Sequence, residues 1–442
     1  MTAHPLLFGF GPLTVSVVIF LLTYGAIVTE RINRSIIALL GAGLMILSGV
    51  ITQQQATAGV DFNTLGLLTG MMVIVALTQK SGVFQYVAVV SAKMVKADPW
   101  WLLVMLSGVT AAFSALLDNV TTVMLVTPVT LLITQALRIT PYPYLFSTIF
   151  ASNIGGTATL IGDPPNIMIG SAAGLTFMDF VLNTAPIATG VLFATLLPIY
   201  LVWGRKMFAS PEDRAQVMRF NEKEAIKDAR LLKQSLSVMA LVVAGFIAAH
   251  ELHLEPATIA LFGAALLLLL QSIGKPAETQ SQLVHRTFAE VEWITIFFFI
   301  GLFIVVAGIE HAGALKWLSQ EIIILTAGDF NATAIAILWV SAVLSALVDN
   351  IPFVATMIPV IQNMAPTFGA DNLNPLWWSL ALGACLGGNG SLIGASANLI
   401  IAGFAERAGH PIRFIPFLLM AFPLMLMSVA MCHLYIMLRY LN

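Results

Sequence analysis

Leu160-Ile-Gly-Asp-Pro-Pro-Asn166 interrupts a long apolar segment, residues 145–174, and this interruption shapes the architecture expected of the chain. The prolines at its centre lack N–H donors and clash with the preceding turn, so one continuous helix cannot run through them. The motif returns 232 residues later (398 − 166) as Leu392-Ile-Gly-Ala-Ser-Ala-Asn398, within the apolar segment 375–405. A membrane protein that repeats such a broken element in both halves is typical of secondary transporters, whose site lies where the broken helices meet.

A second motif recurs at almost the same spacing. Ser114-Ala-Leu-Leu-Asp-Asn119 returns 231 residues later (349 − 118) as Ser345-Ala-Leu-Val-Asp-Asn350. Each Asp-Asn pair lies in the middle of an apolar stretch, near 100–137 and near 330–365. Each stretch is either a re-entrant hairpin or a pair of full spans with a short polar turn. Both options cross the membrane an even number of times, so the sequence leaves the choice open.

The composition is that of a membrane protein. The chain is 59% hydrophobic and 10% charged, against roughly 25% charged residues in a soluble domain. We therefore expect an all-α polytopic membrane protein with about ten transmembrane helices, two hairpins and two unwound helices. The ten apolar runs of spanning length lie near 11–29, 34–51, 62–80, 145–174, 186–204, 235–250, 256–272, 292–310, 375–405 and 413–440.

Basic residues predict the orientation in the cell (inner) membrane. The hydrophilic linker 205–234 is rich in Lys and Arg, which places it in the cytoplasm. It separates a first repeat, 1–204, from a second repeat, 235–442, and an odd number of crossings in each makes the two repeats inverted. Both termini are then extracytoplasmic. We expect no cleavable signal peptide, because residues 1–10 lack a basic region and Glu30-Arg31 follows the first apolar run.

The broken spans predict local chemistry. Asn166 and Asn398 are expected to cap the restarted half-helices. Non-helical backbone at membrane depth is tolerated only where it lines a cavity or is buried in protein. The freed carbonyls are expected to hold cations, and the restarted helix N-termini to favour oxygen atoms with partial negative charge.

Three runs carry a family resemblance: Ser152 to Asn166 (SNIGGTATLIGDPPN), Leu117 to Thr121 (LDNVT) and Gly387 to Asn398 (GGNGSLIGASAN). They resemble the arsenite efflux permeases of the ArsB type, and the pattern is similar to that of the melanosomal P protein and the NhaD sodium/proton antiporters. All belong to the ion transporter superfamily. The resemblance implies an elevator-like transporter with re-entrant hairpins and with unwound segments at 155–166 and 387–398. The chain departs from a symmetric pattern at Ala395, which stands where the first repeat has Asp163.

The repeated motifs and the resemblance together define the expected site. Proton coupling is assigned to Asp163, Asp118 and Asp349, because burial in apolar surroundings favours the protonated form of a carboxyl group. Cys385 is treated as a small core residue, and no Cys/His cluster suggests a metal or another cofactor. The residues expected to bind substrate and ions are Asp118, Asn119, Thr121, Gly156, Thr157, Asp163, Asn166, Asp349, Asn350, Gly388, Asn389, Ser391 and Asn398.

The charges of these segments narrow the substrate. No Lys, Arg or His lies in the central part of either broken span or at either hairpin tip, so the cavity suits a cation or a neutral polyhydroxyl solute. Arsenous acid is such a trihydroxide, and the first expectation is extrusion of arsenite and antimonite in exchange for protons. Sodium/proton antiport is the alternative, and a channel or another small-solute carrier is less favoured. A soluble arsenite-stimulated ATPase could dock on the basic linker; the other partner is the lipid bilayer, and no nucleic acid is expected.

An enzyme would be a different class of function. Intramembrane aspartyl proteases carry two Asp residues on neighbouring helices, but in a Gly-x-Gly-Asp sequence. Asp118 and Asp349 are preceded by Leu-Leu and Leu-Val, and duplication is foreign to those enzymes. The sequence therefore predicts a transporter and not an enzyme.

Overall fold

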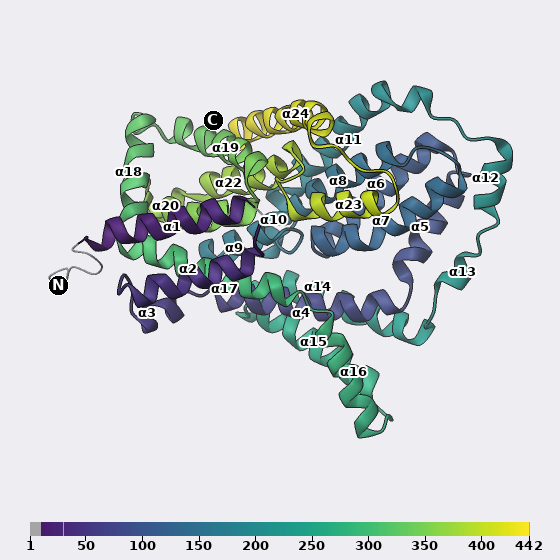
Figure 1. The fold of residues 1–442 in the computed structure, drawn as a ribbon, viewed down its shortest axis with the longest axis horizontal. Helices are drawn as coiled ribbons and strands as arrows, with labels where there is room; N and C mark the ends of the chain where they lie inside the picture. The colour runs from purple at the N-terminus through teal and green to yellow at the C-terminus, as the bar shows by residue number, and fades with distance from the viewer. Residues whose placement is uncertain (1–9, 30, 442) are drawn as a thin grey trace.

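The computed structural model describes residues 10–29 and 31–441, which form helices and no β-strand (Figure 1). The first series contains α1 (Pro12–Val28), α2 (Arg34–Leu47), α3 (Gln53–Ala58), α4 (Phe62–Lys80), α5 (Val83–Met94), α6 (Pro99–Leu116), α7 (Asn119–Ala136), α8 (Tyr142–Thr157), α9 (Pro164–Ala173), α10 (Phe177–Asn183) and α11 (Ala185–Val202). The linker contains η1 (Gly204–Lys206), α12 (Pro211–Met218) and α13 (Glu222–Ala225). The second series contains α14 (Ala229–Leu252), α15 (Pro256–Ser272), α16 (Ala277–Ala289), α17 (Trp293–His311), α18 (Ala314–Leu325), α19 (Phe330–Leu347), α20 (Asn350–Gln362), α21 (Ala365–Phe368), η2 (Ala370–Asn372), α22 (Asn374–Gly387), η3 (Gly388–Gly390), α23 (Ser396–Arg407) and α24 (Phe414–Tyr440).

Within the described ranges, eight helices are long and apolar enough to cross a membrane: α4, α6, α7, α11, α14, α17, α19 and α24. The consecutive helices α9 and α10, bent by 115°, could add a ninth span. The apolar helices α1, α2, α5, α15 and α20 are shorter. The all-helical membrane fold is confirmed, whereas the expected number of crossings stays a prediction. The signal-peptide argument rests partly on residues 1–9 and Glu30, which lie outside the described residues.

Six helices form what we call the scaffold unit: α1, α2, α4, α14, α15 and α17. Its centre consists of two closely packed helix pairs, α2 with α17 and α4 with α15, in the lower half of Figure 1. Glycine allows both close approaches. A Cβ atom on Gly301 would lie 2.5 Å from the backbone of Ala38, and one on Gly70 would lie 2.6 Å from the backbone of Ala260. Small residues at these crossings are typical of helix packing in membranes.

The remaining long helices form a second body, the core unit: α6 to α9, α11, α19, α20 and α22 to α24. The pairs α6 with α8 and α19 with α22 are its most extensive contacts, and α7 packs on α23 as α20 packs on α9. Most of this body lies in the upper half of Figure 1. Both predicted hairpins and both broken spans therefore belong to one packed unit.

The two helix breaks lie where the sequence predicts them, but their caps differ. α8 ends at Thr157 and α9 begins at Pro164, and in the second series α23 begins at Ser396. The prediction that Asn166 and Asn398 are N-caps is wrong, since Asp163 and Ala395 occupy the N-cap positions. α9 restarts before Asn166 because proline fits the first helical turn, where its fixed φ is suitable and its missing N–H is not needed.

Each predicted hairpin is a pair of helices joined by a two-residue turn. Leu117 and Asp118 connect α6 to α7, and Val348 and Asp349 connect α19 to α20. In each turn the Asp is the N-cap of the following helix and accepts a hydrogen bond from one of that helix's first backbone N–H groups. The duplicated Asp-Asn motif is thus a helix-starting motif in both places.

Candidate functional site

The tips of both hairpins and the breaks of both spans meet in the interior, where a small chamber of about 30 Å³ lies. Its walls include five of the predicted site residues: Asp118, Asn119, Thr121, Asp163 and Asn350. Thr295, Leu68 and Met72 from the scaffold unit also line it, so the chamber lies at the boundary between the two units.

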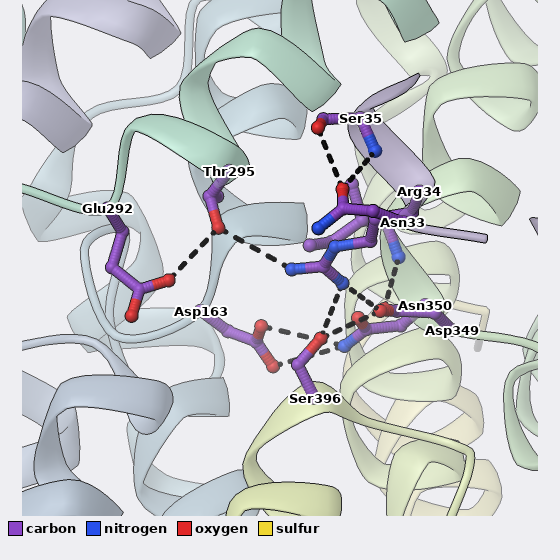
Figure 2. Close-up of polar contacts among 10 residues, drawn as sticks. Asn33, Arg34, Ser35, Asp163, Glu292, Thr295, Asp349, Asn350 and Ser396 are labelled. Atoms are coloured by element: carbon purple, nitrogen blue, oxygen red, sulfur yellow. Dashed lines mark hydrogen bonds and ion pairs between the residues drawn. The ribbon is translucent and has the colours of Figure 1, made fainter. Parts of the chain in front are cut away.

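Asp163 is the most deeply buried of the three acidic residues, with 1% of its surface exposed. Both of its carboxylate oxygens accept from the side-chain amide of Asn350, at 3.3 and 3.5 Å (Figure 2). Within the described part of the chain, no basic side chain forms an ion pair with it. Ionised carboxylates are rarely buried without a cation, which singles out Asp163 among the acidic residues of the site.

Asp118 is held by its own helix. The backbone N–H of Thr121 donates to one carboxylate oxygen at 2.7 Å, and the hydroxyl of Thr121 donates to the other. The predicted residue Thr121 therefore acts by fixing the Asp118 carboxylate at the chamber wall.

Asp349 has a partner that the sequence analysis missed. Arg34, at the start of α2, donates to its carboxylate at 2.8 Å, and the hydroxyl of Ser396 donates to the same oxygen at 2.8 Å (Figure 2). Arg34 also donates to the Ser396 hydroxyl at 2.7 Å and contacts the face of the Phe298 ring. The prediction of a cavity without cations thus holds for the segments on which it rested but is wrong for the assembled site.

The sequence by itself shows Arg34 only as a basic residue that flanks an apolar span. It is 315 residues from Asp349 in the sequence, and only the packing of α2 on α17 brings them together. On the other side of the guanidinium, Thr295 accepts a weaker hydrogen bond at 3.5 Å and donates to Glu292. Figure 2 shows Arg34 lying between the Glu292–Thr295 pair and the Asp349–Ser396 pair.

A buried amide network joins the two series of helices behind the chamber. Asn153 on α8 donates to the side-chain oxygens of Asn389 and Asn398, both at 3.0 Å, and accepts from Asn119 at 3.2 Å. Asn119, Asn389 and Asn398 were predicted site residues, whereas Asn153 was not. A signal was present, because Asn153 lies in the resemblance run, two residues before Gly155.

Asn166 and Asn398 brace the breaks. Asn166 donates to the carbonyls of Gly156, Thr157 and Thr159, and Asn398 donates to those of Gly388 and Ser391. The sequence analysis expected freed carbonyls to hold cations. Side-chain amides hydrogen-bond to these carbonyls here, and a carbonyl oxygen has a second lone pair, so cation binding by the carbonyls stays a prediction.

The remaining predicted residues support the breaks rather than line the chamber. The hydroxyl of Thr157 donates within α8 to the Asn153 carbonyl, and the hydroxyl of Ser391 donates to the Ala346 carbonyl. Gly156 and Gly388 let the chain pass close to itself, since an added Cβ would lie 2.6 Å from the Gly162 carbonyl and 3.0 Å from the Gly394 carbonyl, respectively.

Corresponding positions of the two series differ at several points around the site, and three of these differences involve Asp163, Asn153 and Arg34. Asp163 corresponds to Ala395, and Asn153 corresponds to the buried Cys385, whose thiol donates to Asn166 at 3.4 Å. Arg34 corresponds to Pro256, because each is the first residue of its helix. Each also lies four residues before an alanine, Ala38 or Ala260, that packs on a scaffold glycine (38 − 34 and 260 − 256). The site therefore contains one set of Arg34, Asn153 and Asp163 and not two.

Two vestibules of about 290 Å³ each approach the interior. The Arg34 vestibule, lined among others by Arg34, Asp349, Ser396 and Leu399, shares several wall residues with the chamber. The Pro256 vestibule, lined among others by Pro256 and Ile167, shares none with it. Leu399 is 38% exposed, whereas Ile167, its counterpart, is 2% exposed. The chamber is thus closer to the Arg34 side in this structure.

Helices broken at the centre of an apolar helical protein, beside buried carboxyl groups, define the class of secondary membrane transporters. The family model described as "CitMHS: Citrate transporter" matches residues 24–383. The chain therefore belongs to this family of the ion transporter superfamily.

Relatives extend over nearly the whole chain. The Mycobacterium tuberculosis protein named "Uncharacterized transporter Rv2684" is 41% identical over 96% of this chain and 98% of its own length. The human P protein is 32% identical over 95% of this chain and 59% of its own length. Among solved structures, the Neisseria gonorrhoeae MtrF protein has a TM-score of 0.58 at 11% identity, and the match covers 97% of this chain and 95% of that chain. The Alcanivorax borkumensis YdaH transporter has a TM-score of 0.52 at 14% identity, and the match covers 97% of this chain and 99% of that chain. These two show likeness of fold alone.

Proposed function

We propose that the protein is a proton-coupled secondary transporter in which Asp163 carries the proton through the transport cycle. The observation that best supports this proposal is the burial of Asp163 beside the Asn350 amide, with no ion-pair partner among the described side chains. An ionisable residue inside a membrane protein is a functional group by default. Asn350 donates to the carboxylate form, and its amide oxygen can accept from the protonated form.

The cycle proposed is of the elevator type, in which the core unit moves against the scaffold unit. The separate packing of the two units supports this mechanism, and so does the chamber at their boundary. Asp118 and Asn350, from opposite hairpins, line that one chamber. Two full-span pairs would leave their turns at opposite membrane faces, so this meeting supports re-entrant hairpins and inverted repeats 1–204 and 235–442. The basic linker supports an orientation in which the Arg34 side faces the cytoplasm.

The first candidate cargo is arsenite or antimonite, extruded in exchange for entering protons. Carboxylates and amides that line the chamber can bind hydroxyl groups, and a neutral trihydroxide is not repelled by the acidic residues Asp118 and Asp163. The cargo enters through the Arg34 vestibule of about 290 Å³, and the small chamber widens to receive it.

Chamber size favours a second candidate, sodium/proton antiport. A chamber of about 30 Å³ is two to three times the roughly 10–15 Å³ that a cavity needs to hold one water molecule, so it suits an ion with little of its hydration shell. The same oxygens of Asp118 and Asp163 would then bind Na⁺ and H⁺ in alternation.

The proposal predicts that Asp163→Asn abolishes uphill transport, because the amide fixes the neutral state while keeping the shape. Purified protein is reconstituted into vesicles with an imposed pH gradient, and arsenite, Na⁺ and citrate are supplied separately. We expect proton-driven flux of one of the first two solutes to be lost in the variant, because an amide cannot take up and release the coupled proton. Exchange across a balanced gradient should persist.

Asp329→Asn is the matched control, since Asp329 caps α19 at its other end, away from the chamber. It should transport like the unchanged protein. Full proton-driven transport by Asp163→Asn would move the coupling site to Asp118 or Asp349. Proton-driven citrate flux alone would overturn both cargo candidates.

A further inference from the structure

The Arg34–Asp349 ion pair connects the two units of the protein. Arg34 begins α2 of the scaffold unit, while Asp349 and Ser396 belong to the core unit. If the core unit moves relative to the scaffold unit, this contact must therefore break or the Arg34 side chain must move with Asp349. Arg34 is only partly shielded, with 26% of its side chain exposed towards the vestibule, so a solute or ion entering there can reach the pair.

No equivalent contact exists for the corresponding residues. Pro256 stands where Arg34 would be, and it has no charge. The carboxylate of Asp118, the counterpart of Asp349, is bonded to Thr121 of its own helix. An ion pair between the units therefore holds the core unit in its present position. If the core unit moved to the opposite position, Pro256 and Asp118 could not form the corresponding ion pair.

The charges around Arg34 show what it can exchange for. Asp118, Asp163 and Glu292 line the chamber with it, and Asp349 lines the adjoining vestibule. Arg34 is the one basic residue among the described walls of these two spaces. The guanidinium of Arg34 therefore neutralises the Asp349 carboxylate. Without Arg34, a bound cation or a proton would have to do so.

We propose that Arg34 is a positioning residue that acts as a built-in cation. It holds the unloaded core unit in the state that is open on the Arg34 side, and it is released when a proton or cation neutralises Asp349. This inference rests on the proposed two-unit transport cycle and adds to it a residue that sets which state the empty protein prefers. A contact present in only one of two states shifts their populations by its differential free energy.

The test measures the state directly. Leu399→Cys reports the Arg34 vestibule and Ile167→Cys reports the Pro256 vestibule, and both native cysteines are buried, so the background is low. A membrane-impermeant maleimide is applied to each side of reconstituted vesicles without any solute. In the otherwise unchanged protein, position 399 should label rapidly and position 167 slowly.

Arg34→Gln should shift the ratio of the two labelling rates about tenfold towards position 167, which corresponds to ~1.4 kcal/mol. This free energy lies between the contribution of an exposed ion pair and the cost of breaking a buried one. Asp349→Asn removes the same pair from the core-unit side and should give a similar shift if Arg34→Gln folds poorly. The double variant should shift no further than either single one, because both remove one interaction. The exchanged pair Arg34→Asp with Asp349→Arg should return the ratio towards its starting value.

Arg31→Gln is the matched control, because Arg31 is exposed three residues before Arg34. Unchanged labelling in folded Arg34→Gln and Asp349→Asn proteins would overturn the inference, as would an equal shift in Arg31→Gln. Labelling needs neither cargo nor a pH gradient. Its failure can therefore be told apart from failure of the proposed proton coupling, which is measured by flux in Asp163→Asn.

Discussion

Asn166 shows how a single amide side chain maintains a broken helix inside a membrane protein. Its nitrogen donates to three backbone carbonyls that a continuous helix would have satisfied, and the residue is fully buried. Asn398 does the same for the second break. In lipid, unsatisfied backbone groups are costly, so these two residues allow non-helical backbone at the centre of the molecule.

Asn166→Ala should lower the free energy of unfolding by about 1–3 kcal/mol, because buried carbonyls lose their donor. The measurement is thermal unfolding of purified protein in detergent. Asn372→Ala is the matched control: Asn372 is exposed and makes one local hydrogen bond, so its loss should change stability little. Equal melting temperatures for the two variants would show that water replaces the Asn166 amide at no cost.

At this scale, the sequence predicts acidic residues better than their partners. Asp118, Asp163 and Asp349 could be selected because a charge in an apolar run is rare and local. Arg34 and Asn153 could not, since their roles depend on distant helices that pack beside them. A basic residue at a span end and an amide in a helix have many ordinary explanations until the packing is known.

Among the elements, the α6–α8 and α19–α22 pairs depend on glycine at the point of closest approach. A Cβ on Gly155 would lie 2.3 Å from the Ala111 carbonyl oxygen, and one on Gly387 would lie 2.5 Å from that of Ala342. The obstructing atoms are backbone, which cannot move without separating the helices. Both hairpins are thus fixed against their broken helices by the same device.

Gly155→Ala and Gly387→Ala should each destabilise the protein by roughly 1–3 kcal/mol, as overpacking does in other cores. Gly108→Ala is the matched control, since Gly108 lies on α6 with no atom near its Cβ position and alanine favours helix. Yield of monodisperse protein and melting temperature are the readouts. A stable Gly155→Ala protein would mean that the α6–α8 contact is looser than the structure has it.

The breaks were predictable at this scale because Gly and Pro act locally, whereas the exact restart was not. Asn166 is a favourable capping residue by type, but Pro164 and Pro165 begin the helix earlier and leave Asn166 inside its first turn. The side chain then serves the carbonyls of the preceding helix. A capping preference gave way to the stronger backbone constraint of proline.

For the whole molecule, the two-unit description predicts which cross-links stop transport. Asn63 on α4 of the scaffold unit donates to Ser171 on α9 of the core unit at 3.3 Å. A short bifunctional thiol reagent joining Asn63→Cys to Ser171→Cys should abolish solute flux in vesicles, because the units can no longer move apart. Cleavage of a reducible linker should restore the flux.

The matched pair joins Ser107 and Ser147, whose hydroxyls lie 2.5 Å apart on α6 and α8 within the core unit. Linking cysteines at these positions should leave transport largely intact. Loss of flux in both cross-linked proteins would contradict rigid movement of the core unit. Retention of flux in both would place the moving boundary elsewhere.

Apolar runs and recurring motifs were enough to predict an all-helical membrane protein with two similar series of elements. They could not predict that α2 and α15 pack on helices of the opposite series, since lipid-facing and protein-facing apolar residues look alike in the sequence. That packing brings Arg34 to the chamber and divides the helices into two units.

The unequal positions Asp163 and Ala395 have a consequence for why both series lie in one polypeptide. Two identical halves paired as separate subunits would obey a twofold axis, and every substitution would appear on both sides of it. Such a dimer could bury two carboxyl groups in one small space, or none. Joining the halves through residues 203–228 allows each to diverge, so Asp163 can lack an acidic counterpart while the braces at Asn166 and Asn398 remain paired. Covalent fusion thus allows a residue such as Asp163 to occur once in a protein built from two similar halves.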